Sequence, residues 1–568
     1  MKKPVIEFKN FSFKYKVQAK PTLKDINLTI YEGEKVLIVG PSGSGKSTLS
    51  NAINGLVPFK YEGEISGSLK IKGKETRDLS IFELSNMVGT VLQDPDGQFI
   101  GLTVAEDIAF KLENDCVAQS EMIEKVKEAA RLVDIENNLK SSPQRLSGGQ
   151  KQRVSLGGVI VGDADILLFD EPLASLDPAT GSHAIELIDK IKKTSKKTIV
   201  IVEHRLEEAL HADVDRIIVV NEGRIAADGT PNEILSSNIL MENGIREPLY
   251  VTALRYAGCK ISENLNLENI ESLNIEECRD NLKEWFESTE KREMNSDDDV
   301  VLEMDNVSFK YSNNRETLKN VSFKIYKGEM VSIVGRNGAG KSTISKLICG
   351  FYKPDSGKIL FEGKDIKKES IKKRAEKIGL VMQNPNQMLS KTMIYDEVAL
   401  GLRVRGVSEE HIKERVLETL KICGLYRLRN WPISALSFGQ KKRVSIAAIL
   451  VLNPSVLILD EPTAGQDFKH YTEIMEFLHE LNNKGVTIIM ITHDMHLMLE
   501  YTNRAIVLSE GKKLKEDNAW NILTDSKIIK EANLKETSLY RLAQRAGIDE
   551  PREFVKTFIA EDRGIRNI

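Results

Sequence analysis

The chain lacks the features that mark secreted or membrane-spanning proteins. It has five cysteines, an odd number, and no CxxC pair. This argues against a disulfide framework or a zinc ribbon and favours a reducing compartment. The longest uncharged run, residues 444–459, is interrupted by Asn453 and Pro454 and is too short to span a membrane. The first ten residues, MKKPVIEFKN, contain no apolar stretch, so we expect no signal peptide.

A basic excess is also lacking, since the formal net charge is −4. Proteins that bind nucleic acid usually carry a net positive charge, so we expect no nucleic-acid partner. Apolar residues make up 41% of the 568 residues and charged residues 29%, which is typical of packed globular domains. This length predicts two to four domains. Because no uncharged run is long enough to span a membrane, we expect any membrane role to depend on another subunit.

The sequence contains one domain twice. Residues 36–48 read VLIVGPSGSGKST and residues 331–343 read VSIVGRNGAGKST, and LSGGQKQR at 146–153 returns as LSFGQKKR at 436–443. An offset that stays between 289 and 296 over whole halves indicates a duplicated domain rather than a short repeat. We predict a first domain, an acidic tail and linker with 15 acidic and 7 basic residues in 241–300, a second domain and a C-terminal helical tail. Their predicted ranges are 1–245, 246–300, 301–530 and 531–568.

Each half alternates short β-branched runs with helical patterns. KVLIV (35–39), DILLF (165–169) and TIVIV (198–202) are apolar and are bounded by turn residues or charges. Such runs are typical of strands buried on both faces of a parallel sheet. Motifs that follow these strands belong to an α/β nucleotide-binding fold, so we predict two α/β domains, each with a mostly parallel sheet.

A glycine-rich loop follows the first strand of each half and opens a helix. Its backbone N–H groups can point at phosphate oxygens, and the helix N-terminus adds positive potential. Lys46 and Lys341 would reach the β- and γ-phosphates, while Ser47 and Ser342 would offer hydroxyls to magnesium. The predicted loop residues are Gly40, Pro41, Ser42, Gly43, Ser44, Gly45, Lys46, Ser47 and Thr48, and Gly335, Arg336, Asn337, Gly338, Ala339, Gly340, Lys341, Ser342 and Thr343.

An Asp-Glu pair closes a later apolar strand in each half, 130 and 125 residues after the loop. Asp170 and Asp460 can hold the magnesium shell, and Glu171 and Glu461 can orient or deprotonate the attacking water. A helix N-cap could explain one such pair. Two pairs in matched positions, each followed by proline, favour the catalytic interpretation.

Histidine, glutamine and tyrosine also recur in matched positions. His204 and His493 end buried strands 33 and 32 residues after the glutamates, which favours contact with the γ-phosphate over a structural role. Gln93 and Gln383 can sense magnesium and the attacking water through their amides. Tyr15 and Tyr311 precede the loops and could stack on adenine, although core packing also explains a single tyrosine.

Together with LSGGQ (146–150), LSFGQ (436–440), ASLD (174–177) and AGQD (464–467), these motifs resemble those of ATP-binding cassette ATPases. The resemblance implies two cassettes paired head to tail, each also carrying a helical signature subdomain and an antiparallel β part. The signature of one half then completes the ATP site of the other. By position, Ser147, Gly149 and Gln150 serve the second loop, and Ser437, Gly439 and Gln440 serve the first.

A narrower resemblance is to the ATPase of energy-coupling factor transporters, carried by QDPDGQF (93–99), GIREPLY (244–250) and the tandem layout. That family imports vitamins and related micronutrients. It implies a transmembrane coupling subunit docked on residues 93–99 and 383–389, a separate substrate-binding membrane subunit, and a place on the cytoplasmic side of the cell membrane. The second segment, QNPNQML, departs from the pattern.

Other functions remain open at this point. Export is an alternative to import, and a soluble tandem ATPase of the ribosome is an alternative to a transporter, although its linker would be basic. DNA-repair cassettes carry zinc cysteines or coiled coils, and neither pattern occurs here. The two sites are expected to differ, because Phe438 replaces Gly148 and Gln466 replaces Leu176. Both changes face the first loop in the head-to-tail arrangement, so we predict that the second loop hydrolyses ATP faster.

Overall fold

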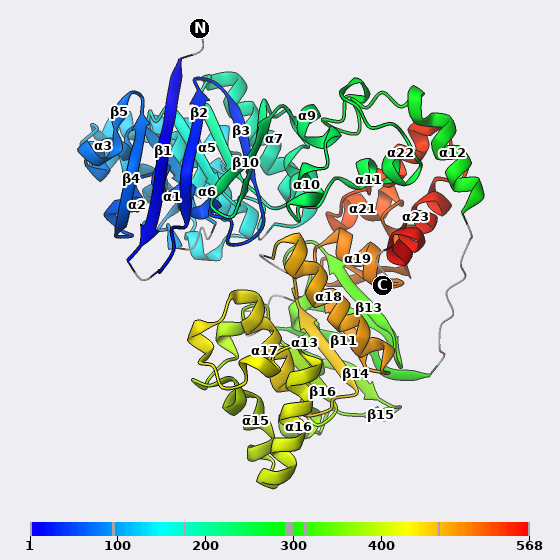
Figure 1. Ribbon diagram of the computed structural model, residues 1–568. Coiled ribbons are helices and arrows are strands. Elements are labelled where there is room, and N and C mark those ends of the chain that lie inside the picture. The colour runs from blue at the N-terminus through cyan, green and yellow to red at the C-terminus, as the bar shows by residue number, and fades with distance from the viewer. Residues whose placement is uncertain are drawn as a thin grey trace. The chain divides into compact units, whose positions relative to one another are not determined.

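The computed structural model describes residues 3–16, 18–93, 97–174, 176–289, 299–311, 316–463 and 466–565. The chain divides into two compact units. One comprises Met1–Glu287 with Asp467–Lys469 and Arg545–Gly547, and the other comprises Ser288–Gln466, His470–Gln544 and Ile548–Ile568. In Figure 1 the first copy of the repeat runs from blue to green and the second copy from green to orange.

A six-stranded sheet forms the centre of the first copy, in the order β10-β9-β3-β8-β7-β6. Its strands are β3 (Lys35–Val39), β6 (Val88–Val91), β7 (Ile166–Asp170), β8 (Thr198–Val202), β9 (Arg216–Asn221) and β10 (Arg224–Gly229). All neighbours are parallel except β10 and β9. Every residue of β3 and β8 is buried, because apolar side chains suit a sheet covered on both faces. Lys35, the one charged residue of β3, lies 3.5 Å from the Asp189 carboxylate.

A second, antiparallel sheet has the order β2-β1-β4-β5. Its strands are β1 (Pro4–Tyr15), β2 (Leu23–Tyr31), β4 (Gly63–Ile71) and β5 (Lys74–Glu75). One apolar cluster joins its inner face, with Phe8 and Phe13, to α1 and the parallel sheet. The helices are α1 (Lys46–Ile53), α2 (Leu56–Phe59), α3 (Ile81–Ser85), α4 (Val104–Asn114), α5 (Gln119–Leu132), α6 (Gly148–Ile160), α7 (Pro178–Ser195), α8 (Leu206–Ala209), α9 (Pro231–Ser236), α10 (Ile239–Glu242), α11 (Leu249–Tyr256) and α12 (Arg279–Ser288). Helices α4, α5 and α6 pack together as a helical subdomain.

The second copy repeats this arrangement, with sheets β12-β11-β14-β15 and β16-β17-β18-β13-β19-β20. The strands are β11 (Val300–Lys310), β12 (Glu316–Tyr326), β13 (Met330–Gly335), β14 (Ser356–Phe361), β15 (Lys364–Asp365), β16 (Ile378–Val381), β17 (Val456–Asp460), β18 (Thr487–Ile491), β19 (Arg504–Ser509) and β20 (Lys512–Asn518). The helices are α13 (Lys341–Ile348), α14 (Ile371–Arg374), α15 (Ile394–Val404), α16 (Glu409–Ile422), α17 (Phe438–Leu450), α18 (Phe468–Asn483), α19 (Met495–Tyr501), α20 (Ala519–Ile522), α21 (Ser526–Ala532), α22 (Ser538–Ala546) and α23 (Pro551–Ile565). The predicted fold class, with its parallel sheet, antiparallel part and helical subdomain in each copy, is confirmed.

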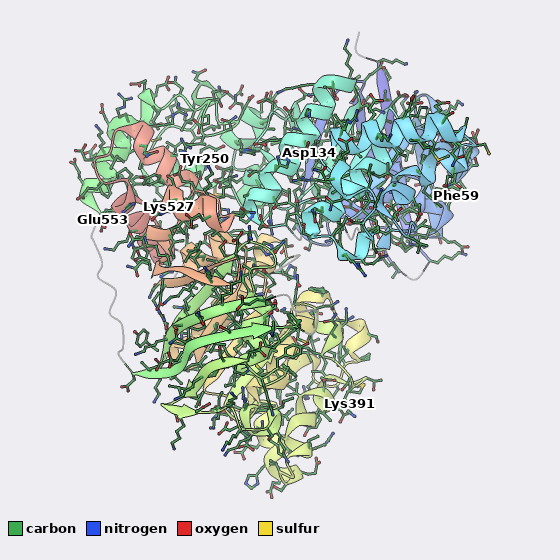
Figure 2. All side chains as sticks on the ribbon, turned by 180° about the vertical axis from the view of Figure 1, so that it is seen from behind. Phe59, Asp134, Tyr250, Lys391, Lys527 and Glu553 are labelled. Carbon is green, nitrogen blue, oxygen red and sulfur yellow. The ribbon has the colours of Figure 1, made fainter. Side chains whose placement is uncertain are left out.

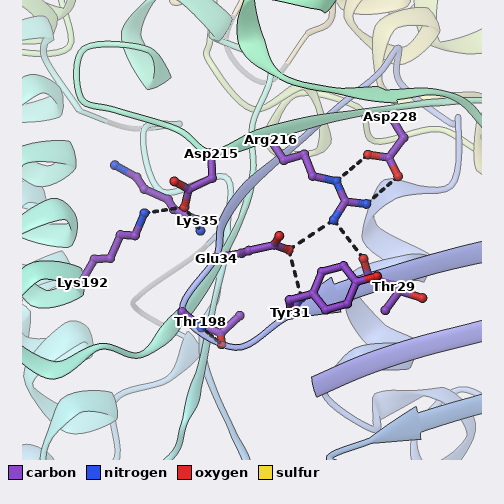
Figure 3. Close-up of polar contacts among 10 residues, drawn as sticks. Thr29, Tyr31, Glu34, Lys35, Lys192, Thr198, Asp215, Arg216 and Asp228 are labelled. Carbon is purple, nitrogen blue, oxygen red and sulfur yellow. Dashed lines mark hydrogen bonds and ion pairs between the residues drawn. The ribbon is translucent and has the colours of Figure 1, made fainter. Parts of the chain in front are cut away.

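An ionic network joins the two sheets of the first copy (Figure 3). Arg216 of β9 makes two bonds of 2.6 Å to Asp228 of β10, donates to the Thr29 carbonyl at 3.0 Å and approaches Glu34 at 3.2 Å. Bidentate guanidinium pairs of this kind fix geometry as well as charge. Arg504 repeats the network with Glu329, Glu516 and the Lys324 carbonyl, so the duplication extends to individual contacts.

The segment after the first copy contains helices α11 and α12. Tyr250 of α11, labelled in Figure 2, is 2% exposed. Its hydroxyl donates to the Leu267 carbonyl at 2.8 Å. The end of the predicted linker, NSDDD at 295–299, lies outside the described residues except for Asp299.

Candidate functional site

The phosphate loop of each copy joins the end of a buried strand to the start of a helix. Gly45 has φ 107°, and a Cβ there would meet Leu23 Cδ2 at 2.9 Å, so this position favours glycine. Lys46 is 4% exposed, and its ammonium donates to the carbonyls of Gly40 at 2.7 Å and Pro41 at 2.9 Å. Lys341 makes the same contacts with Gly335 at 2.6 Å and Arg336 at 3.1 Å. Each lysine therefore spans the loop whose N–H groups would cradle phosphate.

Burial lowers the pKa of Lys46 to about 8, although the negative charges of Glu171 and Asp170 oppose the shift. An ammonium in this position is held among groups of opposite charge and is directed at the loop. A phosphate oxygen would add a further anionic partner, so the site suits a polyphosphate.

The catalytic candidates Glu171 and Glu461 both have left-handed backbone conformations, with φ 49° and 47°. Non-glycine residues rarely adopt this region, and it costs about 1–3 kcal/mol where the surrounding structure imposes it. Each glutamate follows directly on a parallel strand, β7 or β17. The strained turn fixes the carboxylate at the carboxyl edge of the sheet, where ligands bind in this class of fold.

The structure brings the predicted histidine and glutamate together in both copies. His204 Nε2 lies 2.8 Å from Glu171 Oε1, and His493 Nδ1 lies 2.7 Å from Glu461 Oε1. The Gln93 amide donates to Glu171 Oε2 at 2.5 Å. Burial favours a higher pKa for Glu171, but the hydrogen bond from His204 and nearby positive charges hold the pKa below its usual value. Glu171 is therefore an anion that can orient or accept a proton from water.

In the second copy, two of the oxygen donors expected for magnesium, Ser342 and Asp460, lie together. Burial and the neighbouring Glu171 raise the pKa of Asp170 to about 6, and burial likewise raises the pKa of Asp460. Ser342 donates a side-chain hydrogen bond to Asp460. Crowded carboxylates beside a serine hydroxyl are a donor set of the kind Mg²⁺ prefers, so these residues fit that ion.

The two tyrosines contact their loops through their hydroxyls. Tyr15 Oη lies 3.0 Å from Thr48 Oγ1, and Tyr311 Oη lies 3.1 Å from Thr343 Oγ1. The Tyr15 ring also packs edge to face with Phe13 and Tyr61. Tyr15 and Tyr311 are both partly buried. Adenine stacking stays a prediction.

The signature motifs begin helices α6 and α17 with matched capping boxes. Ser147 accepts from the Gln150 N–H at 3.4 Å and Ser437 from the Gln440 N–H at 3.3 Å. In return, the side-chain oxygen of each glutamine accepts from the serine N–H at 3.0 Å. These reciprocal bonds define the helix N-terminus. Phe438 is 42% exposed at the first position of α17. Ser175, Ala464 and Gly465 of the following predicted motifs lie outside the described residues.

Two predicted docking segments surround the glutamines. Residues 94–96 of the first segment lie outside the described residues, whereas all of 383–389 is described. Beside the first segment, Ile100 is 64% exposed and Leu102 is 82% exposed. A cavity of about 420 Å³ is lined by residues of β6, α4 and α6, among them Thr90, Lys111 and Gly158.

Sequence reasoning missed three residues that contact the candidate site. Glu203 is 2% exposed next to His204, and burial raises its pKa to about 8. Lys442 is 1% exposed and contacts the Gln383 carbonyl, and Gln98 bonds to Thr90 and Leu92, just before Gln93. The only signal in the sequence was the comparison of the two copies. At the positions that match Glu203, Lys442 and Gln98, the other copy carries different residues, Thr492, Gln152 and Met388.

Within the part of the chain that the structure describes, no helix combines the length and apolar character required to cross a membrane. Residues 23–174 and 318–464 match the ABC transporter family, and residues 237–309 match a family described as ATP-binding cassette cobalt transporter. The first match covers more than half of the described cassettes in both copies, and the second covers the segment that follows the first copy.

Similar proteins carry the same arrangement over their full length. A protein of Clostridium perfringens named as an ABC transporter ATP-binding protein is 65% identical over 566 residues, covering 100% of both chains. One from Enterococcus faecalis is 57% identical over 568 residues, again covering 100% of both. A solved structure described as cbiO1 from Clostridium perfringens, part of the ABC transporter complex cbiONQ, is 37% identical and covers 44% of this chain and 100% of its own, with a TM-score of 0.39. The chain belongs to the ATP-binding cassette family, as an ATP-binding subunit with two cassettes whose ATPase activity is coupled to transport.

Proposed function

We propose that this chain is the ATPase of an energy-coupling factor type importer for a vitamin or another micronutrient. The observation that carries the proposal is the twin set of loop lysine, strand-end carboxylates and histidine in one chain. The match of residues 237–309 to a family described as a cobalt transporter supports a small nutrient as cargo. The acidic balance of residues 241–300 is unfavourable for the ribosomal alternative.

In the proposed reaction, Lys46 and Lys341 bind the β- and γ-phosphates of ATP. Glu171 and Glu461 orient the attacking water and accept its proton, while His204 and His493 hold these carboxylates and contact the γ-phosphate. Mg²⁺, when bound, neutralises the phosphate charge. Ser47, Gln93 and Asp170 would hold it in the first copy, and Ser342, Gln383 and Asp460 in the second.

We further propose that the two cassettes pair head to tail within the chain. The N–H groups at the start of a signature helix then complete the γ-phosphate site on the other copy's loop, because a helix N-terminus attracts anions. Ser147 and Gly149 would serve the second loop, and Ser437 and Gly439 the first. The matched capping boxes support this role, since both helix starts are held in the same conformation.

The proposed membrane partners are a transmembrane coupling subunit and a substrate-binding subunit, which place the chain on the cytoplasmic side of the cell membrane. Ile100 and Leu102 support docking at the first segment, because neighbouring exposed apolar side chains mark interaction surfaces. Ser390 and Thr392 stand at the matching positions of the second copy. We therefore assign the more apolar contact to the first copy.

The test begins with nucleotide binding by the full chain. We expect Lys46→Ala and Lys341→Ala each to remove about half of the high-affinity ATP sites, and the double variant to remove both. Lys24→Ala, a lysine whose ammonium contacts the Glu222 carbonyl, serves as the control. Unchanged ATP affinity in the double variant would contradict the assignment. Copurification of the native chain with a small membrane protein, and ATP-dependent uptake in vesicles, distinguish import from export.

A further inference from the structure

The two glutamine segments are fixed to their cassettes by different side chains. In the first copy, Gln98 donates to the Thr90 carbonyl at 3.1 Å and accepts from the Leu92 N–H at 3.0 Å. The Gln98 side chain therefore holds its part of the segment against the end of β6. At the matching position the second copy has Met388, whose sulfur lies 3.1 Å from the Met382 nitrogen. A thioether is a weak acceptor and cannot donate, so the second segment lacks an equivalent clamp.

A lysine from the signature helix supplies the missing hydrogen bonds in the second copy. Lys442 of α17 donates to the carbonyls of Met382 and Gln383, each at 2.9 Å. The neighbouring Lys441 reaches the Asn386 side chain at 3.3 Å. In the first copy the residue that matches Lys442 is Gln152, whose amide donates instead to the Pro172 carbonyl. Two substitutions, Gln98 to Met388 and Gln152 to Lys442, thus exchange one clamp for another.

The Lys442 ammonium also faces the catalytic strand end. Its Nζ lies 3.5 Å from the Glu461 carbonyl. Burial lowers the pKa of Lys442 to about 8, although the negative charges of Asp460 and Glu461 oppose the shift. The side chain is 1% exposed. A buried ammonium is costly unless its donors and its charge are matched, and here three carbonyls and two carboxylates offset part of that cost. One side chain therefore links α17, the glutamine segment and the end of β17.

We propose that Lys442 is a positioning residue for ATP hydrolysis in the second cassette. It holds the main chain of Gln383 in register with the strand end that carries Asp460 and Glu461. The inference rests on the proposed hydrolytic function of this site. Lys442 acts through these residues, so its removal loosens the water-orienting and magnesium-binding groups and leaves the phosphate loop in place.

The test uses the full chain carrying Glu171→Gln, so that turnover reports the second site. Lys442→Met removes the ammonium and keeps the length of the side chain. We expect kcat to fall about 10-fold, with KM for ATP within about twofold, because misplacing reacting groups reduces turnover more than binding. Lys442→Arg, which keeps the charge, should retain more of the activity. Lys413→Met, which changes an exposed lysine of α16, is the control and should change kcat by less than about twofold.

Amide hydrogen exchange of the nucleotide-free chain gives a second measurement that needs no turnover. Lys442→Met should speed exchange in a peptide covering residues 378–389, and adding Met388→Gln should slow it again by restoring the first copy's clamp. Lys442→Gln, which introduces the first copy's residue, replaces the Met variant if that variant does not fold.

Unchanged kcat in a folded Lys442 variant would overturn the inference. So would a fall in kcat without faster exchange at 378–389, or a rise in KM with kcat retained. If the Glu171→Gln parent binds ATP but does not hydrolyse it, the proposed function of the second site fails and the catalytic role of Lys442 fails with it. The exchange measurement still reports whether Lys442 holds the segment.

Discussion

At the residue scale, the first copy buries a carboxyl group that the second copy lacks. Glu203 accepts from the Leu173 N–H at 3.0 Å and from the His204 N–H at 2.8 Å, directly beside the candidate catalytic Glu171. Burial, with the nearby charge of Glu171, raises the pKa of Glu203 to about 8. Thr492, which is fully buried, stands at the matching position in the second copy. The pH dependence of the two copies should therefore differ.

Glu203 makes the first copy less stable as pH rises. Its folded-state pKa of about 8 exceeds the ordinary value of 4.5, so the folded state binds more protons between these values. The stability contributed by the protonated group is present below about pH 4.5 and is lost as pH rises through 8. Glu203→Gln should remove on the order of 2–4 kcal/mol of this pH dependence. Thermal unfolding at pH 5.5 and 8.5 measures it, with Glu121→Gln as an exposed control. Equal slopes for Glu203→Gln and the native chain would refute the prediction.

The second ATP site should hydrolyse faster than the first. Phe438 places a half-exposed ring at the start of the signature helix that would serve the first loop, where the other signature has Gly148. A ring beside a phosphate-binding helix end limits close approach of the backbone. The loss would be about 1–3 kcal/mol at the transition state, roughly 5- to 150-fold in rate. If Phe438 instead points away from the nucleotide, the sites are equivalent.

Glu461→Gln should therefore reduce ATP turnover and uptake more than Glu171→Gln in the assembled transporter. Phe438→Gly is the matched variant, and it should raise the turnover that remains in Glu461→Gln. Equal or greater damage from Glu171→Gln in both assays would show that the asymmetry argument is wrong.

The repeated motifs predicted Lys46, Glu171 and His204 as site residues. The structure places all three at the same edge of one sheet. Their positions follow from strand ends and loop glycines, which leave a clear pattern in the sequence. Lys442 leaves no such pattern, because a lysine within a helix is ordinarily solvent-exposed. Its burial depends on which neighbouring segment lies over α17, and that is a property of tertiary packing. Glu203 was missed for the same reason.

At the element scale, the three strands predicted from apolar runs are confirmed, and β3 and β8 have the predicted bounds. The third, β7, begins one residue later than predicted because Asp165 is exposed outside it. Charge counting could not show that residues 249–256 and 279–288 form helices, since buried apolar positions such as Leu254 and Leu282 are interspersed with the charges. The predicted domain limits stay predictions.

Helix α11 depends on one buried ion pair. Arg255 bonds to Glu247 at 3.0 and 2.9 Å and to the Ser237 carbonyl at 2.7 Å, and the Glu247 side chain is 2% exposed. Arg255→Ala would leave this carboxylate buried without its charged partner, which costs about 3–5 kcal/mol. We expect faster proteolysis within residues 238–260. Arg279→Ala, which removes an exposed pair with Glu276, is the control and should leave proteolysis unchanged. Equal cleavage of the two variants would exclude a special role for the Arg255 pair.

At the scale of the whole molecule, attachment to a membrane should require a partner. No described helix can span a bilayer, while the family couples ATP hydrolysis to transport. We expect the chain to sediment with native membranes and to be released when its membrane subunits are absent. Substitution of Ile100 and Leu102 by serine, the polar character found in the second copy, should weaken sedimentation with little change in ATP binding. A chain that remains in the soluble fraction beside its candidate subunits would contradict the transporter assignment.

The difference between the buried Lys442 and its counterpart Gln152 has a consequence for how the two copies can evolve. Cassettes encoded separately can be made in unequal amounts, and two identical copies can then assemble. In this chain every molecule carries both clamps, Gln98 in the first copy and Lys442 in the second, in a fixed one-to-one ratio. A change that suits only one copy is thus never duplicated by assembly, and each copy is free to specialise. The exchange of Gln98 for Met388 beside Lys442 is the trace that such divergence leaves.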